Sequence, residues 1–494
     1  MRRKIIMRII FFDLDTLRPD HLGCYGYKRN TSPSIDSICQ DGVRFDNYYC
    51  PNAPCLPSRA SLVSGRYGIT NGVVGHGGTT ADMRIQGVNR SFKDVFSTTS
   101  LFQRFRNAGL YTASFSTFAE RHSSWWFNCG FNELHNVGLC GDETADMVAP
   151  KVLEWLEKNG KKDNWFLHIN MWDAHTPYRT PADYPNIFEN VPLGDDWVDE
   201  EEFKKHLAHV GPHSANEIEM YHDRPNLRHP KHPNKLTSLA DVKYINDMYD
   251  LGIKYMDERI GDILDYLKQN DLYEDTCIIV TSDHGENFGE LGIYAEHGTA
   301  DDATCKIPMI IKWKNGPRGL VDKGFHDNVD LLPTICDLLN LRKHDIYDGE
   351  SYAQTLIDGT TVDKGSVILT QCAHVCQRAA RFGDYIYIRT YHDGYHLFDD
   401  EMLFNLTLDP HEKNNIAKEN PDICAKGAQL IFEWQNKYML KSPYTEDPLF
   451  VTMHEGGPFH ARGELWHYLP RLEATGRKEG ADLLRQRHPN EIRK

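Results

Sequence analysis

One short window places a nucleophile-capable sulfur four residues before an arginine: residues 55–66 read CLPSRASLVSGR. Pro57 suits the first turn of a helix and Gly65 suits its end, so we expect Cys55 at a helix N-terminus. Backbone N–H groups and the helix dipole favour negative charge there, which predicts an easily ionised thiol. Arg59 could hold an anionic substrate group. Alone, these features also fit a thiol phosphatase or a redox cysteine.

Acidic and imidazole side chains gather at the ends of three apolar stretches. We expect these stretches, residues 8–14, 165–170 and 276–281, to be buried strands. The pairs at their ends are Asp13 and Asp15, Asp173 and His175, and Asp283 and His284. Ligands of α/β sheets bind beyond the carboxyl ends of the strands, so the three pairs should converge on one pocket.

Most of the potential metal ligands at these strand ends are carboxylate oxygens, which suit a hard divalent cation. Asp15, Asp283 and His284 favour Ca²⁺ or Mg²⁺, although Zn²⁺ also accepts His with Asp. Asp13 lies two residues before Asp15 on the same strand face. It is therefore either a further ligand or the cap of a neighbouring turn.

The Cys55 window resembles the signature of type I sulfatases, members of the alkaline phosphatase superfamily. Other segments resemble further motifs of that family, in the family's order: residues 11–27, 171–178, 281–286 and 296–299. The resemblance implies that a formylglycine-generating maturase oxidises Cys55 to formylglycine, whose hydrated aldehyde attacks sulfur. It also implies that this side chain joins the metal ligands and that Arg59 stabilises the developing charge.

The same resemblance implies histidines as sulfate-binding groups. His175 matches a sulfate-contacting histidine, and His297 stands where the family carries a lysine before Gly-Thr. Imidazole in place of ammonium makes that contact sensitive to pH. Either His297 or His175 is expected to protonate the leaving oxygen.

Two positions depart from the family pattern. Thr16 replaces the second of two adjacent aspartates, so the metal site loses a negative charge that Asp13 could restore. The family's Gly-Lys-Trp-His segment is replaced by STFAERH at residues 116–122. Arg121 and His122 could cover the missing substrate contacts, or His122 could be an ordinary loop histidine.

Helices alternate with these strands, which predicts an α/β fold with a large, mostly parallel central sheet covered by helices on both faces. The expected helices are 55–65, 101–109, 146–158 and 239–268. We expect residues 1–365 to form the catalytic domain and 366–494 a smaller C-terminal α+β subdomain. Residues 178–236 lack periodicity and are expected to form an elaborated loop or lid, with solvated histidines between 206 and 232.

Composition limits the partners and the location. The formal net charge of −16 argues against nucleic acid and anionic membranes as partners. Twelve scattered cysteines do not form a disulfide framework, and Arg8 interrupts the apolar run that follows the basic start, so we expect a cytoplasmic protein. The spacing of Cys372, His374 and Cys376 is not that of a usual zinc knuckle.

The expected function is hydrolysis of sulfate esters in small molecules such as sulfated mono- or oligosaccharides. A phosphonate or phosphate ester hydrolase of the same superfamily is the alternative, because similar tetrahedral anions fit the same pocket. A protein that binds sulfated sugars without catalysis is the third interpretation.

Overall fold

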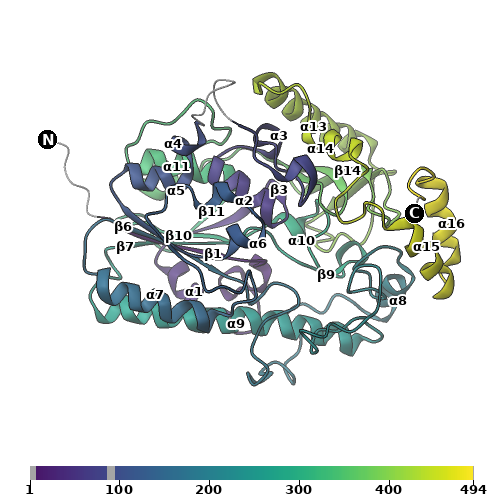
Figure 1. Cartoon of the computed structure of the whole chain (residues 1–494), viewed down its shortest axis with the longest axis horizontal. Coiled ribbons are helices and arrows are strands. Elements are labelled where there is room, and N and C mark those ends of the chain that lie inside the picture. Colours follow the sequence, from purple (N-terminus) through teal and green to yellow (C-terminus); the bar gives the residue numbers. More distant parts are fainter. Residues whose placement is uncertain (1–6, 86–94, 493–494) are drawn as a thin grey trace.

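A computed structural model describes residues 7–85 and 95–492 of the chain. Its centre is an eight-stranded sheet (Figure 1). In spatial order the strands are β11 (Leu320–Asp327), β2 (Val43–Tyr49), β10 (Met309–Lys312), β7 (Thr276–Thr281), β1 (Arg8–Leu14), β6 (Trp165–Met171), β4 (Tyr111–Phe115) and β5 (Glu133–His135). Strand β10 runs antiparallel to both neighbours, and the other adjacent pairs are parallel. The expected mostly parallel sheet is confirmed.

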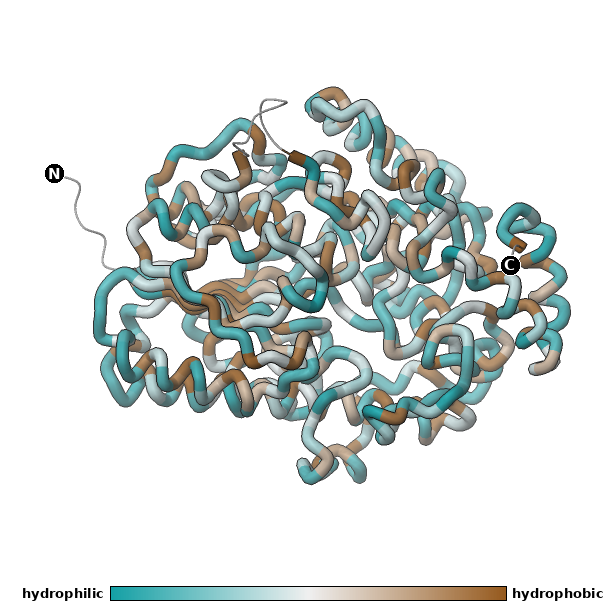
Figure 2. Tube along the Cα trace, in the orientation of Figure 1, coloured by the Kyte–Doolittle hydropathy of each residue, from teal (hydrophilic) through white to brown (hydrophobic). Residues whose placement is uncertain are grey.

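Alternation along β1 explains why helices cover both faces of the sheet. Ile9 and Phe11 pack into one hydrophobic cluster, whereas Ile10 and Phe12 pack into another, because successive side chains of a strand point to opposite faces. One face carries α1 (Pro33–Gln40), α7 (Ala145–Asn159) and α9 (Leu239–Gln269) (Figure 1). The other carries α2 (Cys55–Ser64), α4 (Phe96–Thr99), α5 (Leu101–Asn107), α11 (Leu331–Leu338) and α12 (Ala353–Asp358). Figure 2 shows the hydrophobic strands between the more hydrophilic outer helices.

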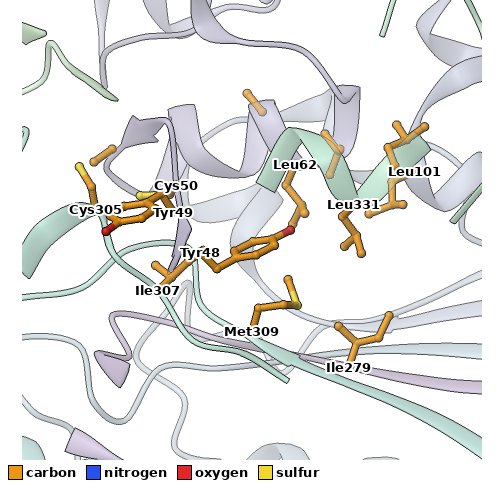
Figure 3. Packing of buried hydrophobic residues seen from close by; sticks show 14 of the residues in the cluster. Tyr48, Tyr49, Cys50, Leu62, Leu101, Ile279, Cys305, Ile307, Met309 and Leu331 are labelled. Carbon is orange, nitrogen blue, oxygen red and sulfur yellow. The ribbon is translucent and has the colours of Figure 1, made fainter. Parts of the chain in front are cut away.

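The apolar cluster beneath α2 fixes the helix that carries Cys55. Leu62 of α2 and Leu331 of α11 lie above Met309 and Ile279 of the sheet (Figure 3). All four side chains are buried, and each contributes on the order of 1.5–3 kcal/mol of hydrophobic free energy. The beginning of α2 is therefore held in one place above the strand ends.

A second sheet forms the core of the C-terminal part and confirms the smaller α+β subdomain. Its strands in order are β15 (Glu401–Asn405), β14 (Tyr385–His392), β13 (Cys376–Phe382), β12 (Ser366–Gln371) and β3 (Asn52–Ala53). The helices of this part are α13 (Pro421–Lys441), α14 (Pro448–His454), α15 (Leu465–Ala474) and α16 (Lys478–Arg487). Because β3 pairs with β12, the residues just before Cys55 are bonded to the C-terminal sheet.

Shorter elements complete the chain. The helices are α3 (Gly68–Asn71), α6 (Phe118–Arg121), α8 (Glu200–Ala208) and α10 (Asp302–Cys305), and a small hairpin joins β8 (Asn287–Phe288) to β9 (Tyr294–Glu296). The single-turn 3₁₀ segments are Pro19–His21, Gly23–Tyr25, Gly78–Ala81, Trp125–Asn128, Glu290–Gly292 and Asn328–Asp330.

The prediction of solvated histidines between residues 206 and 232 is wrong for three of them. His206, His213 and His232 are all less than a tenth exposed. Part of the segment is bonded to a distant element: the Tyr294 hydroxyl lies 2.6 Å from Nδ1 of His206. Periodicity in the sequence does not show such burial, because the contacts come from distant elements.

All twelve cysteines are free thiols. Among the residues that the structure describes, none of the helices combines the length and the apolarity needed to cross a membrane. The basic start discussed above, residues 1–4, lies outside the described residues.

Candidate active site

Cys55 is the first residue of α2 and lies in a buried cluster of polar side chains. Its Sγ is 3.0 Å from Nε2 of His284. One potential ligand atom from each of Asp15, Cys55, Asp283 and His284 lies within 4.8 Å of the others, and all four residues are buried. The structure therefore brings together four residues that the sequence assigned to the metal site.

The sheet explains why these residues meet. Strands β1 and β7 are parallel neighbours with Asp13 beside Thr281, so Asp15 and Asp283 leave the sheet at the same edge. The Asp15 N–H donates to the Met171 carbonyl at the end of β6, which holds the β1 end in place. The Ser58 hydroxyl donates to the Asp283 carbonyl at 2.6 Å and ties α2 to the same edge.

Arg59 binds three carboxylates at once. Its Nε and Nη2 donate to the two oxygens of Asp13 at 2.8 and 2.9 Å, and its Nη1 donates to Asp15 at 3.0 Å and to Asp283. The guanidinium also lies 4.7 Å from the ring centroid of Phe118. All four charged groups are buried, so water contributes little to their stabilisation.

The charges and tautomers of this cluster fit a divalent cation. Three carboxylates surround one guanidinium, and burying the remaining negative charge without a counterion is costly. Burial raises the pKa of Asp283 to about 6, against the attraction of Arg59. Nδ1 of His284 lies 2.8 Å from the Gly285 carbonyl, which fixes the proton on Nδ1 and leaves Nε2 as a ligand atom.

The prediction of an easily ionised Cys55 thiol is wrong. Burial, together with the carboxylates of Asp15 and Asp283, raises the pKa of Cys55 well above its ordinary value. Arg59 and Arg121 lower it, but by less. Although Cys55 begins a helix, burial and the two nearby carboxylates disfavour a free thiolate as the nucleophile.

Asp13 and Thr16 occupy supporting positions. Both oxygens of Asp13 accept from Arg59, and Nε2 of His168 lies 3.2 Å from Oδ2. Asp13 is not part of the four-residue cluster around Cys55. The Thr16 N–H donates to Asp283 at 3.1 Å and its hydroxyl donates to Asp15 at 2.8 Å, so Thr16 orients the two acids.

His175 and His297 both lie beside the cluster. Nε2 of His175 is 3.8 Å from Asp15, and the ring centroids of His297 and His284 are 3.9 Å apart. Nε2 of His297 is 3.0 Å from Glu296 and Nδ1 is 3.4 Å from Glu286. Burial lowers the pKa values of both histidines well below the ordinary range, although Glu296 opposes this at His297.

Arg121 and His122 form the less enclosed side of the site. Both are half-buried, and the Arg121 guanidinium lies 5.2 Å from the centroid of the Trp172 ring. Burial and the two arginines Arg121 and Arg59 lower the pKa of His122 to about 3. Because Cys55 is 1% exposed, substrate access is expected from this side.

Two residues that contact the site were not predicted from the sequence. His168, in the middle of β6, touches Asp13 and lies 3.0 Å from the Ser114 hydroxyl. Arg179 donates to the carbonyls of Trp172 and His175, and its field acts on His175. His168 is detectable as a histidine within an otherwise apolar strand, whereas the 178–236 segment offered no local signal for Arg179.

The profile of the sulfatase family matches residues 8–341. The chain belongs to the sulfatase family. This membership and the named relatives identify it as a sulfuric ester hydrolase.

Relatives match along most of the sulfatase chain. It is 24% identical to the uncharacterised sulfatase YidJ of Escherichia coli strain K12, over 88% of each chain. It is 23% identical to the choline-sulfatase of Rhizobium meliloti strain 1021, over 79% of this chain and 78% of that protein. It is also 23% identical to the N-acetylglucosamine-6-sulfatase of Bos taurus, over 79% and 77% of the two chains.

Two solved structures share the fold of this sulfatase. Phosphonate monoester hydrolase of Agrobacterium radiobacter superposes with a TM-score of 0.66 at 18% identity, over 87% of this chain and 96% of that chain. A protein solved with its substrate D-glucosamine-2-N,6-O-disulfate gives 0.66 at 19% identity, over 89% and 99%. The likeness confirms the expected alkaline phosphatase and sulfatase type of fold.

Proposed function

We propose that this sulfatase uses a nucleophile made from Cys55 and a divalent cation bound by that side chain with Asp15, Asp283 and His284. The supporting observation is the buried cluster of these four residues, in which carboxylates outnumber the guanidinium of Arg59. Formylglycine at position 55 would supply the hydroxyl that attacks sulfur, and Ca²⁺ or Mg²⁺ would lower its pKa and neutralise sulfate charge. A maturase that makes formylglycine is the implied partner.

The surrounding residues position the carboxylates and bind the sulfate group. Arg59 keeps the carboxylates in place, and we assign Asp13 to holding Arg59, because both Asp13 oxygens accept from it. His175, Arg121 and His122 line the side expected to receive the sulfate group, where positive groups stabilise the developing charge.

Proton delivery to the leaving oxygen is assigned to His297. Its ring lies next to His284, and its two nitrogens have carboxyl partners in Glu286 and Glu296. These partners can exchange a proton with the imidazole during the reaction. His175 has one ring nitrogen at the Thr176 carbonyl and is assigned to sulfate binding.

The proposed substrates are small sulfated saccharides. One relative is named an N-acetylglucosamine-6-sulfatase, and one structural neighbour holds a disulfated glucosamine. We propose a cytoplasmic location from the sequence alone, which fits imported mono- or oligosaccharides as substrates.

The deciding experiment combines mass spectrometry of the Cys55 peptide with assays of sulfate release. Protein co-expressed with a maturase should carry formylglycine at position 55 and release sulfate from 4-nitrophenyl sulfate. Activity should disappear in Cys55→Ala and after chelation, and Ca²⁺ or Mg²⁺ should restore only the wild type. Cys277→Ala, which removes another buried thiol of the sheet, should retain activity.

Several results would contradict the proposal. Full turnover with an unmodified thiol would exclude the formylglycine nucleophile. Faster cleavage of a nitrophenyl phosphonate ester than of the sulfate would favour a phosphonate hydrolase, whose fold this chain shares. Tight binding of sulfated sugars by the formylglycine form without any turnover would favour a binding protein.

A further inference from the structure

A second group of potential metal ligands lies beside the first and shares no residue with it. One ligand atom from each of His213, Glu296 and His374 lies within 4.8 Å of the others, and all three residues are buried. His213 belongs to the segment between α8 and α9, Glu296 ends β9, and His374 lies between β12 and β13. The fold therefore brings three distant parts of the chain to one point.

The orientation of His213 is that of a metal ligand. Its Nδ1 lies 2.8 Å from the Ile218 carbonyl, which places the proton on Nδ1. The other nitrogen, Nε2, is buried without a hydrogen bond and lies 3.2 Å from a Glu296 oxygen. A lone pair that faces a carboxylate is repelled unless a cation lies between them, and metal-bound histidines commonly donate their second N–H to a carbonyl.

Glu296 offers one oxygen to this point. Its Oε1 accepts from the backbone N–H of His297 at 3.0 Å, whereas Oε2 is the oxygen nearest to His213. Oε1 also lies 3.0 Å from Nε2 of His297, so Oε2 is the oxygen that faces the proposed ion.

His374 completes the donor set as a neutral imidazole. Its Nε2 is 3.7 Å from Glu296 Oε1, and its ring stacks on His460 with centroids 4.3 Å apart. Burial and the neighbouring imidazoles His460 and His213 lower the pKa of His374 well below its ordinary value. Neutral imidazole is the form that coordinates a metal.

We propose that His213, His374 and Glu296 bind a Zn²⁺ ion. Ligand atoms of tetrahedral zinc lie about 3.3 Å apart, as follows from bonds of about 2.0–2.1 Å, and the 3.2 Å between Nε2 of His213 and Oε2 of Glu296 agrees with this. Two imidazoles and one carboxylate are a usual zinc donor set that leaves a fourth position open. The bound ion would join the 178–236 segment to the β8–β9 hairpin and to the C-terminal sheet.

A third group of similar composition shows the contrast. His392, Asp393 and His488 also cluster, but Nε2 of His488 lies 2.8 Å from Asp393 and its Nδ1 lies 3.0 Å from Glu491. Nε2 of His392 has Glu491 as its partner, and its Nδ1 accepts from the Gly394 N–H. Each imidazole nitrogen there has a hydrogen-bonding partner, so the group needs no ion and supplies a matched control.

The test is a Zn²⁺ titration of the metal-free protein in saturating Ca²⁺, which occupies the Cys55 site with its preferred hard cation. The wild type should bind one Zn²⁺ per chain by calorimetry. His213→Gln and His374→Gln should weaken that binding by about 100-fold or more, since loss of supporting residues alone costs 10–100-fold. His392→Gln and Asp283→Asn should bind zinc like the wild type.

Crystals soaked in Zn²⁺ provide a second measurement that requires no variant. An anomalous difference peak between His213, His374 and Glu296 would support the site even if a variant failed to fold. Absence of that peak, zinc binding unchanged in folded His213→Gln and His374→Gln, or zinc binding lost in Asp283→Asn would overturn it. These outcomes do not depend on turnover of a sulfate ester, so they are separate from the test of the proposed function.

Discussion

Replacing Arg59 by glutamine removes the guanidinium that three buried carboxylates share. Asp13 loses two hydrogen bonds, and Asp15 and Asp283 lose one partner each. Breaking a buried ion pair from one side costs about 3–5 kcal/mol, because the remaining charge has neither partner nor water. We expect Arg59→Gln to lower the free energy of unfolding by that amount.

Asp13→Asn should cost less, about 1–3 kcal/mol, because Arg59 keeps Asp15 and Asp283 as partners. The double variant should lose less than the sum of the single losses. When Arg59 is absent, replacing Asp13 by asparagine removes a carboxylate that would otherwise be buried without its partner. The expected coupling energy is about 1–3 kcal/mol for two residues in direct contact.

Urea unfolding of the four proteins measures this cycle, and calorimetric titration with Ca²⁺ tests the role of Asp13. If Asp13 holds Arg59, Asp13→Asn should bind Ca²⁺ nearly as well as the wild type. Arg378→Gln is the control, because Arg378 is another buried arginine and pairs with Asp447 at 2.6 Å in the C-terminal part. It should lose stability while the folded protein retains activity. Additive losses in the cycle, or loss of Ca²⁺ binding in Asp13→Asn without loss of stability, would refute the reasoning.

Two further predictions concern stability. The carboxylates of Asp393 and Glu491 raise the pKa of His488 to about 9 despite its burial, so its contribution is complete below about pH 6.5 and disappears as pH rises through 9. His488→Gln should therefore cost about 1–2 kcal/mol at pH 6.5 and almost nothing at pH 10; an equal cost at both values would contradict this. At Gly285 an added methyl would lie 2.0 Å from the Ala303 carbonyl oxygen, so Gly285→Ala should cost about 1–3 kcal/mol in urea unfolding and displace His284. At Gly298 the nearest atom would be 3.5 Å away, so Gly298→Ala should be as stable as the wild type, and equal losses in both variants would count against the steric argument.

Local patterns in the sequence were enough to predict the central sheet and the main cluster. Apolar runs gave the strands that became β1, β6 and β7, and their parallel arrangement brings Asp15, Asp283 and His284 together. Pro57 and Gly65 marked a helix that the structure places at Cys55–Ser64. These features depend on periodicity and end signals within a few residues, which a single sequence contains.

The pKa of Cys55 and the burial of the histidines could not be predicted from local sequence patterns. Burial raises the pKa of the thiol, and Asp15 and Asp283, which are 40 and 228 positions away along the chain, raise it further. His213 lies in a segment without periodicity and becomes buried through contacts with β9 and the β12–β13 connection. Such contacts follow from chain packing rather than from neighbouring residues.

By itself, the sequence determined the chemical groups of this sulfatase and the edge of the sheet at which they gather. Only the tertiary structure decided that Arg59 donates to both oxygens of Asp13 and that His213 and His374 lie beside Glu296. The physical reason is the separation along the chain over which each effect acts. Strand and helix signals act over a few residues, whereas pKa values and ligand sets depend on distances between residues that folding alone brings together.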